Sequence, residues 1–261
     1  MSVGTEEAPA GDALTDDAFL GGRLQLLQPP RGHRAGHDAM LLAASAPEAA
    51  RAVDLGAGVG AAGLAYAVRV PAAQVTLVEI VPELAALALR NAARQSPDLV
   101  GRVRVVEADV ATLGRPSGPP EPPARAADLV LMNPPFNDPA RHRLSPHAGR
   151  ALAHAVADAD VTIWLRAAER LLAPGGRLAL IHRPEAIEAL LTGLKGRFGA
   201  VTIRPVHPGP GAPAHRLLIG AVKGRRTPPA FLPGFVLADE AGRPSAAAER
   251  VLREGRAIGP D

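Results

Sequence analysis

The chain has 261 residues, enough for one hydrophobic core and too few for two large domains. It is 47% hydrophobic and 21% charged, as in ordinary soluble globular proteins, and its lack of cysteine excludes disulfides, thiolate metal sites and a cysteine nucleophile. Residues 1–20 hold five acids and no Lys or Arg. Because the whole chain carries +3, residues 21–261 carry +8. This basic body suits an anionic partner such as RNA, although a preference for Arg codons would give the same charge.

The amino-terminal segment does not resemble a secretory signal, because it is acidic and polar rather than basic and then apolar. No stretch is apolar for the length that a membrane span requires. We therefore expect a cytoplasmic protein without membrane contact. Its oligomeric state does not follow from the sequence, and a monomer is the default. Residues 1–17 are polar and rich in small residues, so we expect them to be disordered.

Predicted strands and helices alternate along most of the chain. A strand or hairpin over 19–28 comes first, and Asp38 is expected to cap a helix through residues 40–42 after a polar loop. Seven later runs predict strands and four segments predict helices. The strands are 52–55, 74–78, 103–107, 128–132, 177–182, 200–206 and 215–222, and the helices are 60–70, 82–94, 161–172 and 184–198. This alternation predicts an α/β fold with a mostly parallel sheet covered on both faces.

Two segments do not follow this alternation. Residues 114–127 are rich in Pro and Gly and predict an exposed, stiff loop. Residues 224–261 are rich in Pro, Gly, Ala and Arg and predict a tail with one short helix near 245–252. The folded domain is therefore expected to cover residues 18–223.

A glycine-rich loop lies between the first strand of the predicted sheet and the helix after it. Its sequence is Asp54-Leu55-Gly56-Ala57-Gly58-Val59-Gly60. Glycines there permit a tight turn and let a ligand approach the backbone. Taken alone, the loop also fits a dinucleotide site or a plain strand–helix turn. Asp54 is expected to hold the amino group of a ligand or the loop itself.

Two further acids stand at the ends of the next strands. Glu79 ends the second strand, where a carboxylate accepts hydrogen bonds from ribose hydroxyls, and Asp109 follows the third strand, where it can accept one from an adenine amine. Ligands of open parallel sheets bind at the carboxyl ends of the strands, so these acids are expected to line one site. With the glycines they resemble the class I methyltransferase pattern, which implies S-adenosylmethionine as the cofactor.

The most specific motif is Asn133-Pro134-Pro135-Phe136, directly after the fourth strand of the predicted sheet. Two consecutive prolines fix the backbone, donate no amide hydrogen and disfavour helix for the residue before them. The resulting turn displays the Asn133 side chain and nearby carbonyls. An exocyclic amine is a poor nucleophile because its lone pair is delocalised into the ring. Acceptors at Asn133 Oδ1 and the Pro134 carbonyl would favour a pyramidal nitrogen, and Phe136 offers a face on which a base can stack.

This motif resembles the Asn/Asp-Pro-Pro-Tyr/Phe signature of amino methyltransferases that act on adenine N6, guanine N2 or protein glutamine. A closer resemblance extends over residues 18–222 to the bacterial tRNA1(Val) adenine-N6 methyltransferase family. It is based on residues 19–22, residues 32–42, the glycine loop and the Asn-Pro-Pro-Phe motif. The family usually has a small hydroxyl residue where His37 stands here.

The resemblance implies a seven-stranded sheet that is parallel except for its last strand, and N6-methylation of adenine in tRNA. It also implies which residues contact the cofactor and the RNA. The cofactor would be held by Gly36, Asp38, Asp54, Gly56, Gly58, Gly60, Glu79, Asp109 and Asn133. The catalytic group would be Asn133, Pro134 and Phe136, and the RNA base would contact Pro135 and Phe136. The basic residues His33, Arg34, Arg141 and Arg143 lie in the same two loops and are expected to contact phosphates, although a solvated surface would have the same composition. The histidines lack metal-ligand spacing, so no metal site is expected.

Four other functions remain open from the sequence. Guanine-N2 methylation of ribosomal RNA uses the same motif, but such enzymes often carry a duplicated domain for which 261 residues leave no room. Glutamine methyltransferases usually place a helical domain before the glycine loop and end the motif in Tyr. The remaining alternatives are a non-catalytic RNA-binding protein with this fold and an oxidoreductase.

Overall fold

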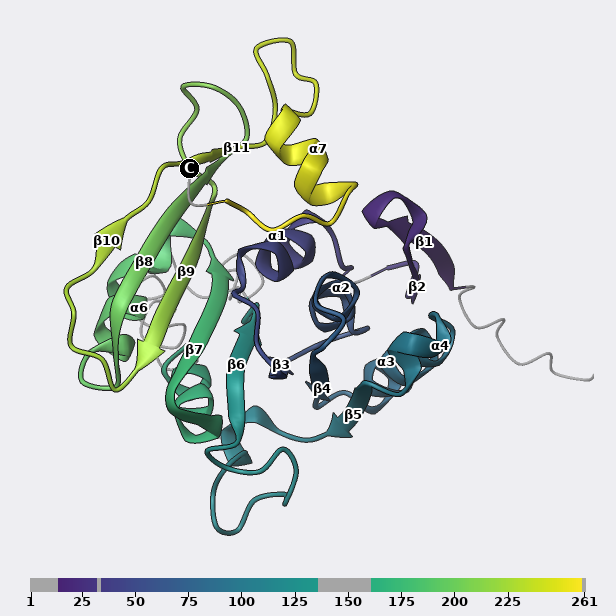
Figure 1. The fold of residues 1–261 in the computed structure, drawn as a ribbon, viewed down its shortest axis with the longest axis vertical. Coiled ribbons are helices and arrows are strands. Elements are labelled where there is room, and N and C mark those ends of the chain that lie inside the picture. Colours follow the sequence, from purple (N-terminus) through teal and green to yellow (C-terminus); the bar gives the residue numbers. More distant parts are fainter. Residues whose placement is uncertain (1–13, 32–33, 136–160, 260–261) are drawn as a thin grey trace, which may run out of the picture.

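The computed structural model describes residues 14–31, 34–135 and 161–259. Within these ranges a nine-stranded sheet forms the centre, with the strand order β10-β8-β9-β7-β6-β3-β4-β5 and with β11 also paired to β8 (Figure 1). The pairs β7–β6, β6–β3, β3–β4 and β4–β5 are parallel, whereas β9 is antiparallel to β7 and β8. These strands are β3 (Arg51–Leu55), β4 (Gln74–Glu79), β5 (Val103–Glu107), β6 (Ala127–Met132), β7 (Leu172–His182), β8 (Phe198–His207) and β9 (Arg216–Lys223). The α/β fold is confirmed, and so is β9 as an antiparallel strand, but the predicted seven-stranded sheet is extended to nine strands by β10 and β11, which follow β9.

Helices cover both faces of the sheet, which explains why its central strand β6 is apolar and buried over nearly its whole length. Neighbouring strand residues alternate between two buried clusters; Leu129 belongs to one and Val130 to the other. The first cluster is completed by α1 (His37–Ser45), α2 (Ala61–Arg69), α3 (Pro82–Ala93), α4 (Pro97–Val100) and α7 (Ala246–Leu252). The second is completed by a helix described over 161–171, by α6 (Ile187–Leu194) and by η2 (Val110–Thr112). No helix in the described part of the chain is long and apolar enough to cross a membrane.

A hairpin precedes the sheet. Strand β1 (Thr15–Phe19) pairs antiparallel with β2 (Leu24–Gln28), and the short helix η1 (Leu20–Gly22) joins them. The expectation of disorder is therefore wrong for residues 15–17, and residues 1–13 lie outside the described ranges. Pairing with β2, whose Leu24 and Leu26 are fully buried, is a long-range contact that the local composition does not reveal.

Asn91 on α3 fastens this hairpin to the glycine loop. Its side-chain Oδ1 accepts a hydrogen bond from Leu27 N at 2.8 Å, and its Nδ2 donates to Leu27 O and Val59 O, each at 3.0 Å. The side chain is fully buried. A buried amide with this many partners is expensive to replace, because removal leaves backbone groups unpaired. The hairpin is therefore part of the scaffold that holds the loop in place.

The predicted carboxyl-terminal tail packs on the domain. Two short strands, β10 (Ala230–Phe231) and β11 (Phe235–Val236), pair with β8, and the predicted short helix is confirmed as α7. Ser245 caps α7, because its Oγ accepts from Ala248 N at 3.0 Å. Figure 1 shows α7 beside α1 and the hairpin turn. Ile258 N then donates to Ala44 O at 2.9 Å, so the segment after α7 returns to α1.

Several predicted boundaries are wrong. Strand β7 begins at Leu172, so Pro174-Gly175-Gly176, predicted to stop the preceding helix, lies inside a strand that pairs irregularly with β6. The helix predicted over 184–198 is shorter and consists of η4 (Pro184–Ala186) followed by α6. Asp38 does not cap α1: Gly36 occupies that position, and Asp38 lies in the first turn.

Candidate active site at the carboxyl ends of four strands

The carboxyl ends of β3, β4, β5 and β6 meet at one edge of the sheet. In the strand register Leu55 lies beside both Val78 and Met132, and Glu79 lies beside Glu107. The glycine loop, Glu79, Asp109 and Asn133 follow directly from these positions. The structure therefore brings together the described residues that the sequence predicts for cofactor binding and for chemistry, at the edge where open parallel sheets bind ligands.

The three glycines of the loop each adopt the left-handed backbone conformation. Their φ angles are +64° at Gly56, +57° at Gly58 and +90° at Gly60, a region that side chains with a Cβ rarely enter. Gly58 N donates to Glu79 Oε2 at 2.8 Å, which ties the loop to β4. A Cβ on Gly58 would meet no atom within 4 Å, so this part of the loop faces open space that a ligand can occupy.

Gly56 has a second reason to be glycine. A Cβ there would lie 2.2 Å from the ring of Trp164, the sole tryptophan of the chain, which comes from the helix described over 161–171. The aromatic ring therefore packs directly on the loop backbone. This contact joins residues more than a hundred positions apart, and the sequence offers no signal for it.

These two glycines make a matched pair for substitution. Gly58→Ala is expected to add only left-handed strain, ~1–2 kcal/mol. Gly56→Ala adds the same strain and an overpacked contact with Trp164 worth a further ~1–3 kcal/mol. Urea denaturation should therefore show a larger loss of stability for Gly56→Ala. Equal losses in the two variants would mean that the ring moves aside and does not hold the loop.

Asp54 is buried beneath the loop, with 2% of its surface exposed. Its Oδ2 accepts a hydrogen bond from Gly63 N, in the first turn of α2, at 2.8 Å. This bond joins β3 to α2 behind the loop, and a contact of Asp54 with the amino group of a ligand stays a prediction. Burial raises the pKa of Asp54 to about 7, because desolvation outweighs the hydrogen bond from Gly63.

Glu79 and Asp109 also accept hydrogen bonds from the backbone. Glu79 Oε1 accepts from Ile80 N and Val81 N, each at 2.9 Å, in addition to the bond from Gly58 to Oε2. Both carboxylate oxygens of this buried side chain are therefore anchored. Asp109 is exposed and caps η2, with Oδ1 accepting from Ala111 N at 2.8 Å. Glu79 and Asp109 lie at neighbouring strand ends, as the predicted ribose and adenine contacts require.

Asn133 begins the turn after β6. Its Oδ1 is buried and, among the described residues, has no hydrogen-bond partner. A buried acceptor without a partner costs ~1–3 kcal/mol unless a ligand or water supplies the donor. Pro134 is buried and Pro135 is exposed, so the two prolines hold this acceptor at the boundary between core and solvent.

The segment around α1 has internal partners that the sequence did not predict. Asp38 Oδ2 accepts from Arg216 Nε at 2.7 Å, which joins the start of α1 to the start of β9. Arg34 pairs with Asp17 Oδ2 at 2.6 Å and donates to Pro29 O at 3.2 Å. Gly36 stands before the first turn of α1 and accepts from Ala39 N at 3.2 Å. Cofactor contacts of Gly36 and Asp38, and RNA contacts of Arg34, stay predictions.

The other predicted RNA contacts His33, Phe136, Arg141 and Arg143 lie outside the described residues. Two histidines, His182 and His215, lie at the same edge of the sheet, and the sequence predicted no role for either. His182 ends β7 and is 9% exposed, and burial lowers its pKa. His215 precedes β9, and its buried Nδ1 has no hydrogen-bond partner among the described residues. No group of three or more potential metal ligands occurs in those ranges.

Comparison with known proteins identifies the family to which the chain belongs. Residues 35–205 match the family model described as "Methyltransferase small domain". A solved structure from Agrobacterium tumefaciens, described as a predicted O-methyltransferase, superposes with a TM-score of 0.69. The two sequences are 32% identical, and the superposed region covers 85% of this chain and 98% of the Agrobacterium chain.

The names of two curated relatives state different methyl acceptors. The tRNA1(Val) (adenine(37)-N6)-methyltransferase of Aeromonas hydrophila is 36% identical over 57% of this chain and 58% of its own length. The release factor glutamine methyltransferase of Salmonella typhimurium is 34% identical over 54% of this chain and 50% of its own length. The chain thus spans only about half to three-fifths of the length of these relatives.

Proposed function

Because the chain belongs to the methyltransferase small-domain family, we propose that it methylates the exocyclic amine of an RNA base, with S-adenosylmethionine as cofactor. The proposed acceptor is adenine N6 in a tRNA. The observation that carries this proposal is the buried Oδ1 of Asn133 after β6, which has no hydrogen-bond partner in the described part of the chain. An amine hydrogen of the substrate is the donor that this oxygen lacks.

The loop and its neighbours fit the cofactor. Open space beside Gly58 accommodates a ligand next to the backbone, and Glu79 and Asp109 stand where ribose hydroxyls and an adenine amine would lie. The proposed cofactor contacts are completed by Gly36, Asp38, Asp54, Gly56, Gly60 and Asn133. When bound, S-adenosylmethionine would supply an electrophilic methyl group and leave as S-adenosylhomocysteine, and the methylated amine would lose one proton to solvent. The protein is proposed to supply position and polarity.

The chemistry proposed for the protein is the activation of a planar nitrogen. Asn133 Oδ1 and the Pro134 carbonyl accept hydrogen bonds from the two amine hydrogens, which draws the nitrogen toward a pyramidal shape and frees its lone pair. The prolines keep both acceptors in place before the substrate arrives, so no reorganisation is needed during the reaction. Phe136 is proposed to hold the base by stacking, worth ~1–3 kcal/mol.

Two observations support RNA as the substrate. The chain after its first twenty residues carries +8, which favours a polyanion. The Aeromonas relative is named for a tRNA adenine. The Salmonella relative is named for a protein glutamine, whose side-chain amide is also a planar nitrogen, so the motif alone does not separate the two.

Transfer of tritium from labelled S-adenosylmethionine tests the proposal. The protein is incubated with total RNA and, separately, with total protein, both from cells that lack its gene. We expect label in tRNA that nucleoside analysis identifies as N6-methyladenosine. Label in protein would support glutamine methylation, and label at guanine N2 or on a ribose oxygen would exclude adenine.

Calorimetry with S-adenosylmethionine and with a nicotinamide dinucleotide separates the remaining alternatives. We expect binding of S-adenosylmethionine alone. Absence of both binding and transfer would indicate a non-catalytic protein that has kept the fold, and binding of the dinucleotide would favour an oxidoreductase.

A further inference from the structure

A second pocket lies away from the proposed active site. It has a volume of about 850 Å³ and opens between the hairpin turn, the end of α2 and residues 253–257; we refer to it as the distal pocket. Helix α2 starts directly after the glycine loop and ends at Arg69 in the wall of the distal pocket. Its nine residues separate the two regions by ~12 Å, at 1.5 Å per residue.

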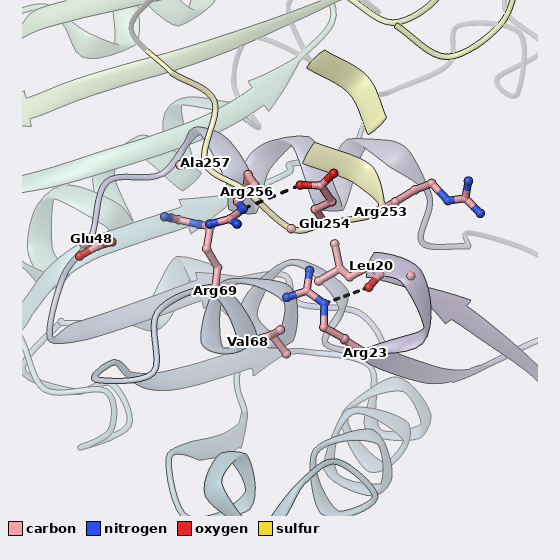
Figure 2. A pocket seen from close by; sticks show the side chains of 11 residues that line it. Leu20, Arg23, Glu48, Val68, Arg69, Arg253, Glu254, Arg256 and Ala257 are labelled. Atoms are coloured by element: carbon pink, nitrogen blue, oxygen red, sulfur yellow. Dashed lines mark hydrogen bonds and ion pairs between the residues drawn. The ribbon is translucent and has the colours of Figure 1, made fainter. Parts of the chain in front are cut away.

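The lining of the distal pocket is basic. It includes Arg23, Arg69, Arg253 and Arg256, against the acids Glu48 and Glu254. Figure 2 shows the side chains of Arg23, Arg69 and Arg256 reaching into the same part of the pocket, whereas that of Arg253 points away. These three guanidinium groups and the carboxylates of Glu48 and Glu254 together carry a net charge of +1, so an anion in the pocket would be stabilised.

Few of the N–H donors of these arginines have protein partners. Each guanidinium carries five donors in a planar fork. Among the described residues, Arg23 donates only from Nε, to Leu20 O at 3.2 Å, and Arg256 reaches Glu254 only at 3.9 Å, beyond hydrogen-bond distance. Arg69 is more constrained, because it donates to Ala43 O at 3.1 Å and also to Ala46 O. The terminal groups of Arg23 and Arg256 therefore remain available to a ligand.

The walls of the distal pocket are held close together by two glycines. A Cβ on Gly21 would lie 2.9 Å from Arg253 O, and a Cβ on Gly255 would lie 2.8 Å from a terminal nitrogen of Arg23. Both glycines have left-handed φ angles, +65° and +61°. The Gly21 contact is with backbone, so the hairpin turn approaches Arg253 too closely for a side chain, whereas the Arg23 side chain beside Gly255 can move aside. The backbone that carries Arg253 is therefore held against the hairpin turn, while the Arg256 side chain is 75% exposed and can reach a ligand in solvent.

We propose that the distal pocket binds a phosphate group of the RNA substrate, remote from the base that is methylated. This assignment rests on the proposed function. The planar fork of arginine matches phosphate oxygens, and phosphate contacts position a nucleic acid without reading its sequence. Every nucleotide of an RNA carries a phosphate, so one RNA can reach both the distal pocket and the glycine-loop edge.

Charge reversal at Arg256 tests the proposal, with Arg243→Glu as the matched control. Both arginines are highly exposed, at 75% and 78%, each has an acid nearby, and both lie in the carboxyl-terminal segment, but Arg243 does not line the distal pocket. Binding of fluorescent tRNA is measured by anisotropy over a range of salt concentrations. Thermal melting of both variants checks that they fold.

We expect Arg256→Glu to weaken tRNA binding roughly tenfold, as for one lost charge-assisted hydrogen bond. The slope of log affinity against log salt should fall by about one, and the control should match the wild type. In methylation assays KM for tRNA should rise while kcat and cofactor affinity stay unchanged. Arg256→Glu binding tRNA as tightly as the control would overturn the proposal.

A second experiment measures the binding of inorganic phosphate to the wild type and to Arg256→Glu by calorimetry. If Arg256→Glu abolished phosphate binding and left tRNA binding unchanged, the ligand would be a free phosphate compound, and the RNA assignment would be wrong. Labelled methyl transfer by the wild type keeps the two proposals distinct. Transfer to tRNA with no effect of Arg256→Glu refutes only the distal pocket, whereas Arg256-dependent binding of tRNA without transfer to any RNA refutes only the proposed function.

Discussion

Asn133→Ala is expected to lower the rate of methyl transfer by a factor of ~10²–10³, or ~3–4 kcal/mol of transition-state stabilisation, as for the loss of one preorganised polar group in other active sites. The substitution removes the buried Oδ1 that has no partner among the described residues. It leaves the carbonyl of Pro134 as the remaining acceptor. The rate is measured as tritium transfer to tRNA at saturating cofactor.

Two controls make this result specific to the amine. Calorimetry should show nearly unchanged affinity for S-adenosylmethionine in Asn133→Ala, because Glu79 and the glycine loop are intact. Asn133→Asp keeps an acceptor oxygen at the same position, so it should retain more activity than Asn133→Ala. Full turnover by Asn133→Ala would rule out the proposed role of this side chain.

The second large effect is expected in the pH dependence of stability, through Asp54. Burial raises the pKa of Asp54 from 3.8 to about 7. Between these values the folded protein keeps a proton that the unfolded chain has lost, so the free energy of unfolding falls as the pH rises from about 4 to about 7. The whole shift amounts to at most ~4 kcal/mol, at 1.36 kcal/mol for each pKa unit.

Asp54→Asn should remove this dependence. The amide carries no charge to desolvate, and its Oδ1 can still accept from Gly63 N. Urea denaturation from pH 4 to pH 8 should therefore show the variant close to the wild type at pH 4 and more stable at pH 8. Asp128→Asn is the control, because Arg51 holds the pKa of Asp128 below its usual value, so its contribution is lost as the pH falls. A wild-type profile without decline between pH 4 and pH 7 would contradict the raised pKa.

The candidate site was predictable from the sequence to the extent that it depends on strand ends. Glycines after β3, acids after β4 and β5 and a Pro-Pro turn after β6 are local signals, and parallel strands necessarily bring their carboxyl ends to one edge. Their partners were not predictable. The Asp54 carboxylate accepts a hydrogen bond from Gly63 N, and Asp38 pairs with Arg216, which follows it by 178 residues. A carboxylate within a motif does not reveal whether backbone, arginine or ligand satisfies it.

By itself the sequence determined the α/β class, the seven central strands and the helix near 245–252, because apolar runs, proline and capping residues act within a few positions. The tertiary structure alone decided the rest. Strand β1 includes residues predicted to be disordered, and the two-residue strands β10 and β11 carry no periodicity, so each is stable only through its partner strand. The distal pocket has the same origin. Its arginines are scattered in sequence from Arg23 to Arg256, and only the packing of the last segment against the hairpin and α2 collects them.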